Sequence, residues 1–201
     1  MFQNHQYLSL PEAPTPLWRY VDLWKFLSLL EHESLWFSRL DTLGDPYEGL
    51  PTRPLIDDMW KIPNEIPELE RLHRAQSASH NTGVFSAGGK TLSVSCWHVN
   101  PVESAAMWSL YAPLGEGIAI RTTLENFRRS FTREEPIVYG GMVRYVDFES
   151  YRPTSLNLLD WATLKRTSFE HEREFRGIVM PSTWPIPPGV GVPADLNTLI
   201  S

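Results

Sequence analysis

The chain has 201 residues, of which 42% are hydrophobic and 21% charged, as is ordinary for a globular domain with a buried core. A net charge of −6 argues against broad nucleic-acid backbone binding, and a single cysteine, Cys96, excludes an internal disulfide. No apolar run approaches the roughly 20 residues that span a bilayer, and the first nine residues lack the pattern of a signal peptide. We therefore expect a cytoplasmic protein without membrane contact.

The pattern of apolar residues predicts a single domain over residues 17–180. Polar and proline-rich residues 1–16 predict an extended N-terminal arm, and proline-rich residues 181–201 predict a tail. Within the domain, the expected elements in chain order are a strand at 17–20, a helix at 22–33, a strand at 35–38, a helix at 68–79, a strand at 92–97, a helix at 102–111, a strand at 117–121, a helix at 124–131, an extended run at 137–146, a helix at 157–169 and a strand at 172–180.

Two features of this element order bear on the fold. Strands separated by short helices, without regular βαβ alternation, predict an α+β fold with mostly antiparallel, twisted sheets. Residues 52–89 are polar and irregular, which predicts an insertion or a lid over the fold.

The last predicted strand carries the most concentrated charge. Because side chains alternate along a strand, Glu172, Glu174 and Arg176 are expected on one face. Two such carboxylates raise each other's pKa, and a neighbouring arginine lowers it, so one acid could serve in acid–base chemistry. Periodicity alone favours the plainer alternative, a solvated face with a surface salt bridge.

A second candidate is Arg19, which stands between the aromatic residues Trp18 and Tyr20 on the first predicted strand. An arginine in this setting can bind a phosphate or a carboxylate with two hydrogen bonds, while the rings form walls. An arginine on an edge strand whose head reaches into solvent is at least as well supported.

Three further patterns are weaker. Asp45 and Glu48 flank a tight turn, where a helix-capping box is the better interpretation for Asp45, while Glu48 could still face a site. Trp108 and Tyr111 share a helix face and could stack on a planar ligand, although such faces more often belong to a core. Ser93 and Ser95 lie on one strand face and could donate hydrogen bonds into a cleft, although partly buried strand serines are also common without function.

Metal and nucleophile chemistry find little support in the sequence. The six histidines have no paired ligand spacing, so no metal is expected. Cys96 and His98 could suggest a catalytic pair, but a buried structural cysteine is the better interpretation.

The motifs in their shared order resemble a bacterial family known as domain of unknown function 2971. The resemblance covers residues 17–180 and rests on Leu-Trp-Arg-Tyr, Leu-Trp-Phe-Ser, Gly-Asp-Pro-Tyr-Glu, Ser-Val-Ser, Met-Trp-x-x-Tyr-Ala and the final charged strand. The family usually has asparagine where this chain has Gly44, and it usually continues beyond Ser201, so the tail is expected to be short or truncated. The further site candidates are Ser38, Asp45, Glu48, Lys165 and Arg176, all of which lie in these motifs or close to them.

A more distant resemblance links the chain to ADP-ribosyltransferases of the Arg–Ser–Glu type, through Arg19, then Ser93 and Ser95, then the Glu-x-Glu of Glu172 and Glu174. It implies a split core of two sheets with NAD as substrate in the cleft between them.

The same resemblance implies a role for each motif residue. Arg19, with Tyr20, would hold the cofactor's phosphate or ribose, and the serines its nicotinamide-ribose end. Glu174 would bind the ribose hydroxyl and stabilise the developing positive charge, and Glu172 would orient the acceptor.

Two functional hypotheses and one structural alternative follow. The chain could be an enzyme that transfers or hydrolyses the ADP-ribose of NAD, as a toxin-like effector in defence or stress. It could instead be a ligand- or partner-binding module without catalysis, with a cleft lined by Arg19, Glu48, Trp108, Tyr111 and Glu174. In the structural alternative, Lys165, Glu172 and Arg176 form an internal ion network that holds the fold together.

Overall fold

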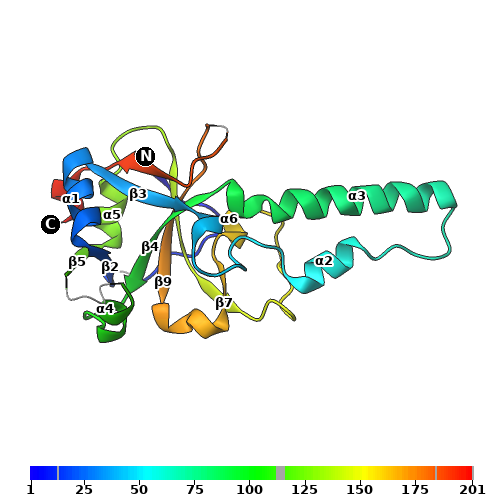
Figure 1. Ribbon diagram of the computed structural model, residues 1–201, viewed down its shortest axis with the longest axis horizontal. Helices are drawn as coiled ribbons and strands as arrows, with labels where there is room; N and C mark the ends of the chain where they lie inside the picture. The colour runs from blue at the N-terminus through cyan, green and yellow to red at the C-terminus, as the bar shows by residue number, and fades with distance from the viewer. Residues whose placement is uncertain (13, 112–115, 184, 201) are drawn as a thin grey trace.

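The structure is a computed structural model that describes residues 1–12, 14–111, 116–183 and 185–200. It combines helices with one large, mostly antiparallel sheet and a second sheet of two strands. The predicted α+β class is therefore confirmed. Both sheets lie in the body of the molecule, and an arm that contains two helices projects from this body (Figure 1).

The eight-stranded sheet brings together strands that lie far apart in the sequence. Its main path runs in the order β1 (Phe2–Gln3), β6 (Val138–Met142), β9 (Glu174–Val179), β4 (Ser93–Val99), β2 (Pro16–Asp22) and β5 (Gly117–Thr123). A side branch pairs β10 (Gly189–Pro193) with β3 (Ser34–Arg39), and β3 joins the path through β4. Among these pairs, only β1 and β6 run parallel.

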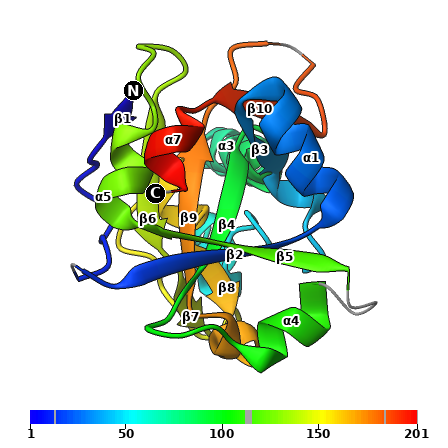
Figure 2. The same cartoon turned by 90° about the vertical axis from the view of Figure 1, so that its left-hand side faces the viewer.

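The central strand β4 changes its neighbour partway along its length. On one side it pairs with β9 from Ser93 to His98. On the other side it pairs with β3 at Ser93 and Val94, and with β2 at His98 and Val99. Beyond that short contact, β2 and β5 cross β4 and β9 at a steep angle (Figure 2). Along the middle of β4, residues 95–97, the described strands leave a gap on that side.

Aromatic side chains fill the main core. Helix α5 (Leu124–Arg129) places Phe127 against Trp97 and Phe175, with edge-to-face ring centroids 5.6 and 5.4 Å apart. All three side chains are buried. Gly177 on β9 makes room for this packing, because a Cβ atom there would lie 2.7 Å from the ring of Phe127. A larger residue at 177 would therefore force the ring to move.

Three more helices flank the large sheet. They are α1 (Leu23–His32), α4 (Ala105–Tyr111) and the short C-terminal α7 (Leu196–Leu199). The predicted start of α1 is confirmed, since the Asp22 side chain accepts a hydrogen bond of 2.8 Å from the backbone N–H of Lys25. Short 3₁₀ helices at Leu40–Thr42 and Gly88–Lys90 lie on either side of the arm in the sequence.

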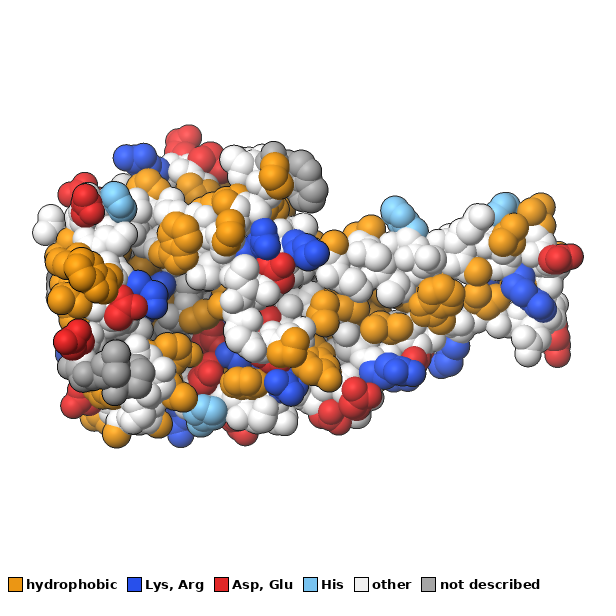
Figure 3. Space-filling view, viewed as in Figure 1, with side chains coloured by type: hydrophobic (Ala, Val, Ile, Leu, Met, Phe, Trp, Pro, Cys, Tyr) orange, Lys and Arg blue, Asp and Glu red, His pale blue; other side chains and the backbone are white. Residues whose placement is uncertain are grey.

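The arm consists of α2 (Arg53–Met59), α3 (Glu68–Ser86) and the segment that joins them. It corresponds to the polar insertion predicted over residues 52–89. The space-filling view in Figure 3 shows apolar, acidic and basic side chains together on its surface. Among the described side chains of α3, only Ala78 is buried.

The region of residues 157–172 departs from the sequence prediction. The helix predicted over 157–169 is wrong, because α6 spans only Leu158–Trp161. The chain then forms β8 (Leu164–Arg166), which pairs with β7 (Arg144–Val146) in the small parallel sheet. A 3₁₀ helix at Thr167–Glu172 follows. Pairing with a distant strand here overrides the local preference for helix.

The two ends of the chain also contribute to the body. β1 pairs with β6 in the segment expected as an extended arm, and β10 pairs with β3 in the segment expected as a tail. Val192 and Leu199 are buried in the main core. Within the part of the chain that the structure describes, none of the helices has the length and apolar character needed to cross a membrane.

Candidate functional site

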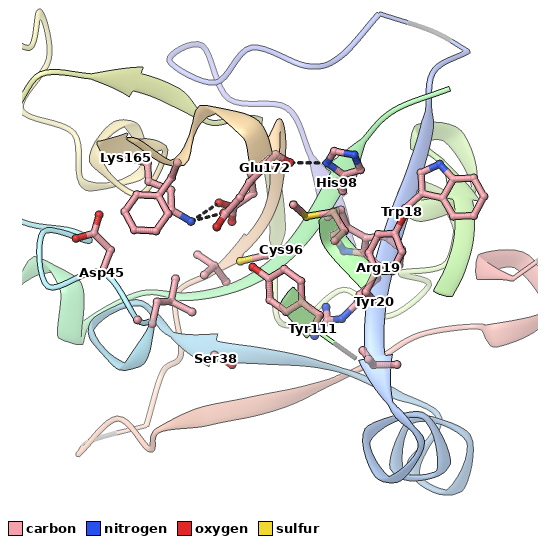
Figure 4. Close-up of a pocket in the computed structure, with 18 of the residues that line it drawn as sticks. Trp18, Arg19, Tyr20, Ser38, Asp45, Cys96, His98, Tyr111, Lys165 and Glu172 are labelled. Carbon is pink, nitrogen blue, oxygen red and sulfur yellow. Dashed lines mark hydrogen bonds and ion pairs between the residues drawn. The ribbon is translucent and has the colours of Figure 1, made fainter. Parts of the chain in front are cut away.

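A cavity of about 530 Å³ lies in the gap beside the middle of β4, and we call it the site cavity. Its wall is built from β2, β3, β4 and β9, with contributions from α4, the loop before the arm and the 3₁₀ helix after β8 (Figure 4). The predicted site residues in this wall are Arg19, Tyr20, Ser38, Asp45, Glu48, Tyr111, Lys165, Glu172 and Glu174. The remaining four do not line it: Ser93, Ser95, Trp108 and Arg176.

Arg176 is fully buried and does not itself line the cavity. Its guanidinium donates two hydrogen bonds to Glu48, of 2.8 and 2.9 Å, and two to Glu174, of 2.7 and 3.1 Å. A fifth, of 2.6 Å, goes to the carbonyl oxygen of Ala162. All five N–H groups of the guanidinium are thus hydrogen-bonded inside the protein, so Arg176 is a structural partner of the two acids.

Lys165 completes the charged cluster from the side of β8. Its ammonium lies 2.5 Å from Glu172, 3.1 Å from Glu174 and 3.4 Å from Glu48. The cluster of Glu48, Glu172, Glu174, Lys165 and Arg176 therefore sets three carboxylates against two cations. When all five groups are ionised, one negative charge remains without a partner inside the cluster.

The two acids of the Glu-x-Glu motif differ in their proton affinity. Burial alone would raise the pKa of Glu174, but the charges of Arg176 and Lys165 outweigh it and lower the pKa to about 2. Burial raises the pKa of Glu172, and the hydrogen bond from Lys165 only partly opposes it. Glu174 is thus a fixed negative charge, whereas Glu172 is the better candidate to exchange a proton.

The backbone at Glu172 also differs from the prediction. Glu172 ends the 3₁₀ helix, Arg173 adopts the left-handed conformation with φ of 39°, and β9 begins only at Glu174. The prediction of one continuous strand through all three charged residues is therefore wrong. The Glu172 carboxylate still reaches the cluster, because Lys165 bridges it to Glu174.

Arg19 spans the gap beside β4. Its guanidinium donates to the hydroxyl of Ser95 and, at 3.1 Å, to the backbone carbonyl of Trp36. It also lies 5.8 Å from the ring centroid of Trp97. The Trp97 indole N–H donates to the same hydroxyl, at 3.0 Å. The Ser95 hydroxyl therefore holds the Arg19 guanidinium in position. The N–H groups of Arg19 that make no hydrogen bond within the protein can bind an anion.

The serine and aromatic candidates divide between the cavity and the core. The hydroxyl of Ser93 is buried away from the cavity and has no hydrogen-bond partner among the described residues. Trp108 packs on Tyr20, with ring centroids 5.1 Å apart, and donates to Glu103 at 3.1 Å. Tyr111 lines the cavity, so of the expected stacking pair only Tyr111 is placed to meet a ligand.

The turn around Asp45 is not the start of a helix, so the capping-box interpretation is wrong. Asp45 is buried and pairs with Arg166 at 2.9 Å, while it accepts a hydrogen bond of 3.1 Å from the backbone of Tyr47. Glu48 turns inward to Arg176. Both acids instead tie this turn to the body, Asp45 through β8 and Glu48 through β9.

His98 enters the site through strand pairing. Its Nδ1 lies 2.6 Å from the carbonyl oxygen of Glu172. A carbonyl only accepts, so the network assigns the proton to Nδ1 and leaves Nε2 as an acceptor in the neutral ring. That atom is buried and has no partner among the described residues. His98 thus fixes the backbone at Glu172 through Nδ1.

Cys96 also lines the cavity, next to Glu174. Burial and the nearby carboxylate raise its pKa well above the ordinary value. The thiol therefore stays protonated, which disfavours a role as nucleophile and agrees with a structural cysteine. Across the described residues, no cluster of histidine, cysteine or acidic side chains is arranged to hold a metal ion.

Lys25, Trp36 and Phe169 line the cavity but are not among the predicted site residues, although Trp36 belongs to the Leu-Trp-Phe-Ser motif. They come from α1, β3 and the 3₁₀ helix, and only the tertiary arrangement brings them together. Phe169 packs over the ammonium of Lys165 at 4.9 Å from the ring centroid.

A scan against family models, a search of curated proteins and a search of solved structures found no match for this chain. The two family resemblances therefore stay predictions.

Proposed function

We propose that the chain binds NAD in the site cavity and transfers its ADP-ribosyl group to an acceptor or to water. The observation that carries this proposal is that Arg19 and Glu174 line one cavity, with Ser95 holding Arg19 in place. These residues come from three different strands, so their meeting is a property of the fold and not of the sequence order.

The charges in the wall suit the two ends of such a substrate. The acidic cluster keeps one negative charge, which favours a positively charged ring and a reacting carbon that gains positive charge. Arg19 offers free donors for a phosphate on the opposite side of the gap. Tyr111 and Trp36 supply aromatic surface between them.

The reaction divides the work between the two glutamates. The bond between the ribose C1′ and the nicotinamide nitrogen breaks, and its electron pair leaves with nicotinamide. An oxygen or nitrogen of the acceptor forms the new bond to C1′ and releases a proton. Glu174, which stays ionised, stabilises the positive charge at C1′. Glu172, whose pKa is raised, is placed to receive the proton.

Nicotinamide release from NAD tests the proposal, with product separated by chromatography. We expect the full chain to release nicotinamide and both E172Q and E174Q to lower the rate by about 100-fold or more. E170Q is the matched control, because Glu170 is an exposed acid in the same 3₁₀ helix and should leave the rate unchanged. Release that is absent, or equal in all four proteins, would reject the proposal.

A second candidate function is binding without turnover. It is favoured by the hydrogen bonds on Glu174, since both carboxylate oxygens already accept from Arg176 and one also accepts from Lys165. A carboxylate held in this way is a rigid recognition element. Calorimetric binding of NAD without nicotinamide release, lost in R19Q, would favour this candidate over the enzyme.

A further inference from the structure

A second cavity, of about 620 Å³, lies beside the site cavity between α1, β2 and β3. We call it the α1 cavity. The two share a wall made of Arg19, Val21, Lys25 and Trp36. Arg19 therefore stands at the boundary of two adjoining spaces and can present its guanidinium to a ligand in either one.

The two cavities differ in charge. The site cavity is lined by the acids Asp45, Glu48, Glu172 and Glu174, beside the bases Arg19, Lys25, His98 and Lys165. The described lining of the α1 cavity contains no acid, but it does contain the bases Arg19, Lys25 and His32. Lys25 pairs with Asp22 at 2.7 Å outside this lining, and its side chain is 73% exposed, so it stays free to turn toward a ligand.

Aromatic surface accompanies the bases of the α1 cavity. Trp24, at 79% exposure, and Trp36, at 52%, are among the most exposed large apolar residues of the chain, and both line this cavity. Exposed indoles beside cations are a poor arrangement for solubility and a good one for stacking a planar ring next to an anion. Leu29 and Leu35 form the buried apolar floor.

We propose that the α1 cavity binds a nucleoside phosphate, with the base against the indoles of Trp24 and Trp36 and the phosphates on Arg19 and Lys25. The described lining offers cationic donors and no carboxylate, and the Asp22 carboxylate that pairs with Lys25 lies outside it in an exposed ion pair, which is weak enough to be exchanged for a phosphate. The exposed rings suit a purine. The shared wall lets the far end of the same molecule enter the acidic site cavity. This last step, one molecule in both cavities, rests on the function proposed above, whereas binding of the nucleoside phosphate does not.

Calorimetric titration of the full chain with ADP, adenosine and pyrophosphate tests the assignment, because none of these probes carries nicotinamide. We expect ADP to bind more tightly than either fragment. W24A should weaken ADP and adenosine by about tenfold and leave pyrophosphate unchanged. K25Q should weaken ADP and pyrophosphate by about fivefold and leave adenosine unchanged. W60A and K61Q are matched controls, since both residues are exposed on the arm and line neither cavity.

The outcomes separate this inference from the proposed function. If ADP binds with the expected dependence on Trp24 and Lys25 but NAD releases no nicotinamide, the α1 cavity is a nucleotide site and the enzyme proposal fails. If nicotinamide is released but ADP neither binds nor competes, the α1 cavity assignment is overturned. Equal binding of ADP and pyrophosphate, or effects of W60A and K61Q equal to those of W24A and K25Q, would also overturn it.

Discussion

The Glu174 carboxyl links the charge cluster to the stability of the fold at the scale of single residues. Its pKa is about 2 in the folded chain, against an ordinary value of 4.5. A carboxyl with a lowered folded pKa stabilises the fold above pH 4.5 and loses that contribution as the pH falls toward 2. For a shift of this size, the contribution is on the order of 3 kcal/mol.

We therefore expect E174Q to differ most from the natural chain above pH 5, with the difference in unfolding free energy shrinking toward pH 2.5. Urea unfolding followed by tryptophan fluorescence at a series of pH values measures this difference in unfolding free energy. E172Q should show the opposite slope: the raised pKa of Glu172 stabilises the fold below pH 4.5, and this contribution is lost as the pH rises. Parallel pH curves for the natural chain and E174Q would contradict the expected role of the cluster.

The same site shows which of its members could be predicted from the sequence and which could not. Charged residues that stand within short motifs are visible in the sequence, and these include Arg19, Glu48, Glu172 and Glu174. The sequence relates His98 and Cys96 only to each other, because it does not show that β4 lies between β2 and β9. Ser93 and Ser95 alternate identically in the sequence, yet only Ser95 lies where β4 pairs with β9 alone and has no described strand on its other side, so only Ser95 meets Arg19.

At the scale of elements, local patterns predicted those strands and helices whose ends carry their own signals. The helix capped by Asp22 and the strand at 92–97 fall in this class. Residues 157–172 do not, since their β8 strand forms against β7 and the left-handed Arg173 ends the 3₁₀ helix. Pairing with a strand elsewhere in the chain decides the structure of such segments, and the hydrophobic periodicity of one short window carries no information about that pairing.

The C-terminal elements β10 and α7 give a prediction at this scale. Leu199 is fully buried in the main core, whereas the next residue, Ile200, is 38% exposed. We expect L199A to lower the free energy of unfolding by about 2–5 kcal/mol, because it leaves a cavity beside the aromatic core. I200A, the neighbouring control, should cost less than about 1 kcal/mol. Equal effects in urea unfolding would mean that α7 is not held against the core as described.

The whole molecule divides into a body that contains both cavities and an arm that contains neither. No described residue from 52 to 89 lines the site cavity or the α1 cavity. The arm instead points away from the body (Figure 1), so it does not cover the site as a lid. The body holds the buried charge cluster and the aromatic core. A cooperative unfolding transition therefore measures the stability of the body.

Replacement of residues 62–76 by a short glycine–serine linker tests this division. None of these residues is buried, so we expect the free energy of unfolding to change by less than about 1 kcal/mol. Binding of ADP should be unchanged, because the linker lies in the arm and both cavities lie in the body. The anchors of the arm stay in place, with Pro54 and Ala78 buried and the Trp60 indole N–H hydrogen-bonded to the Thr82 hydroxyl at 3.2 Å. Loss of cooperative unfolding, or loss of ADP binding with the fold intact, would show that the arm and the body act as one unit.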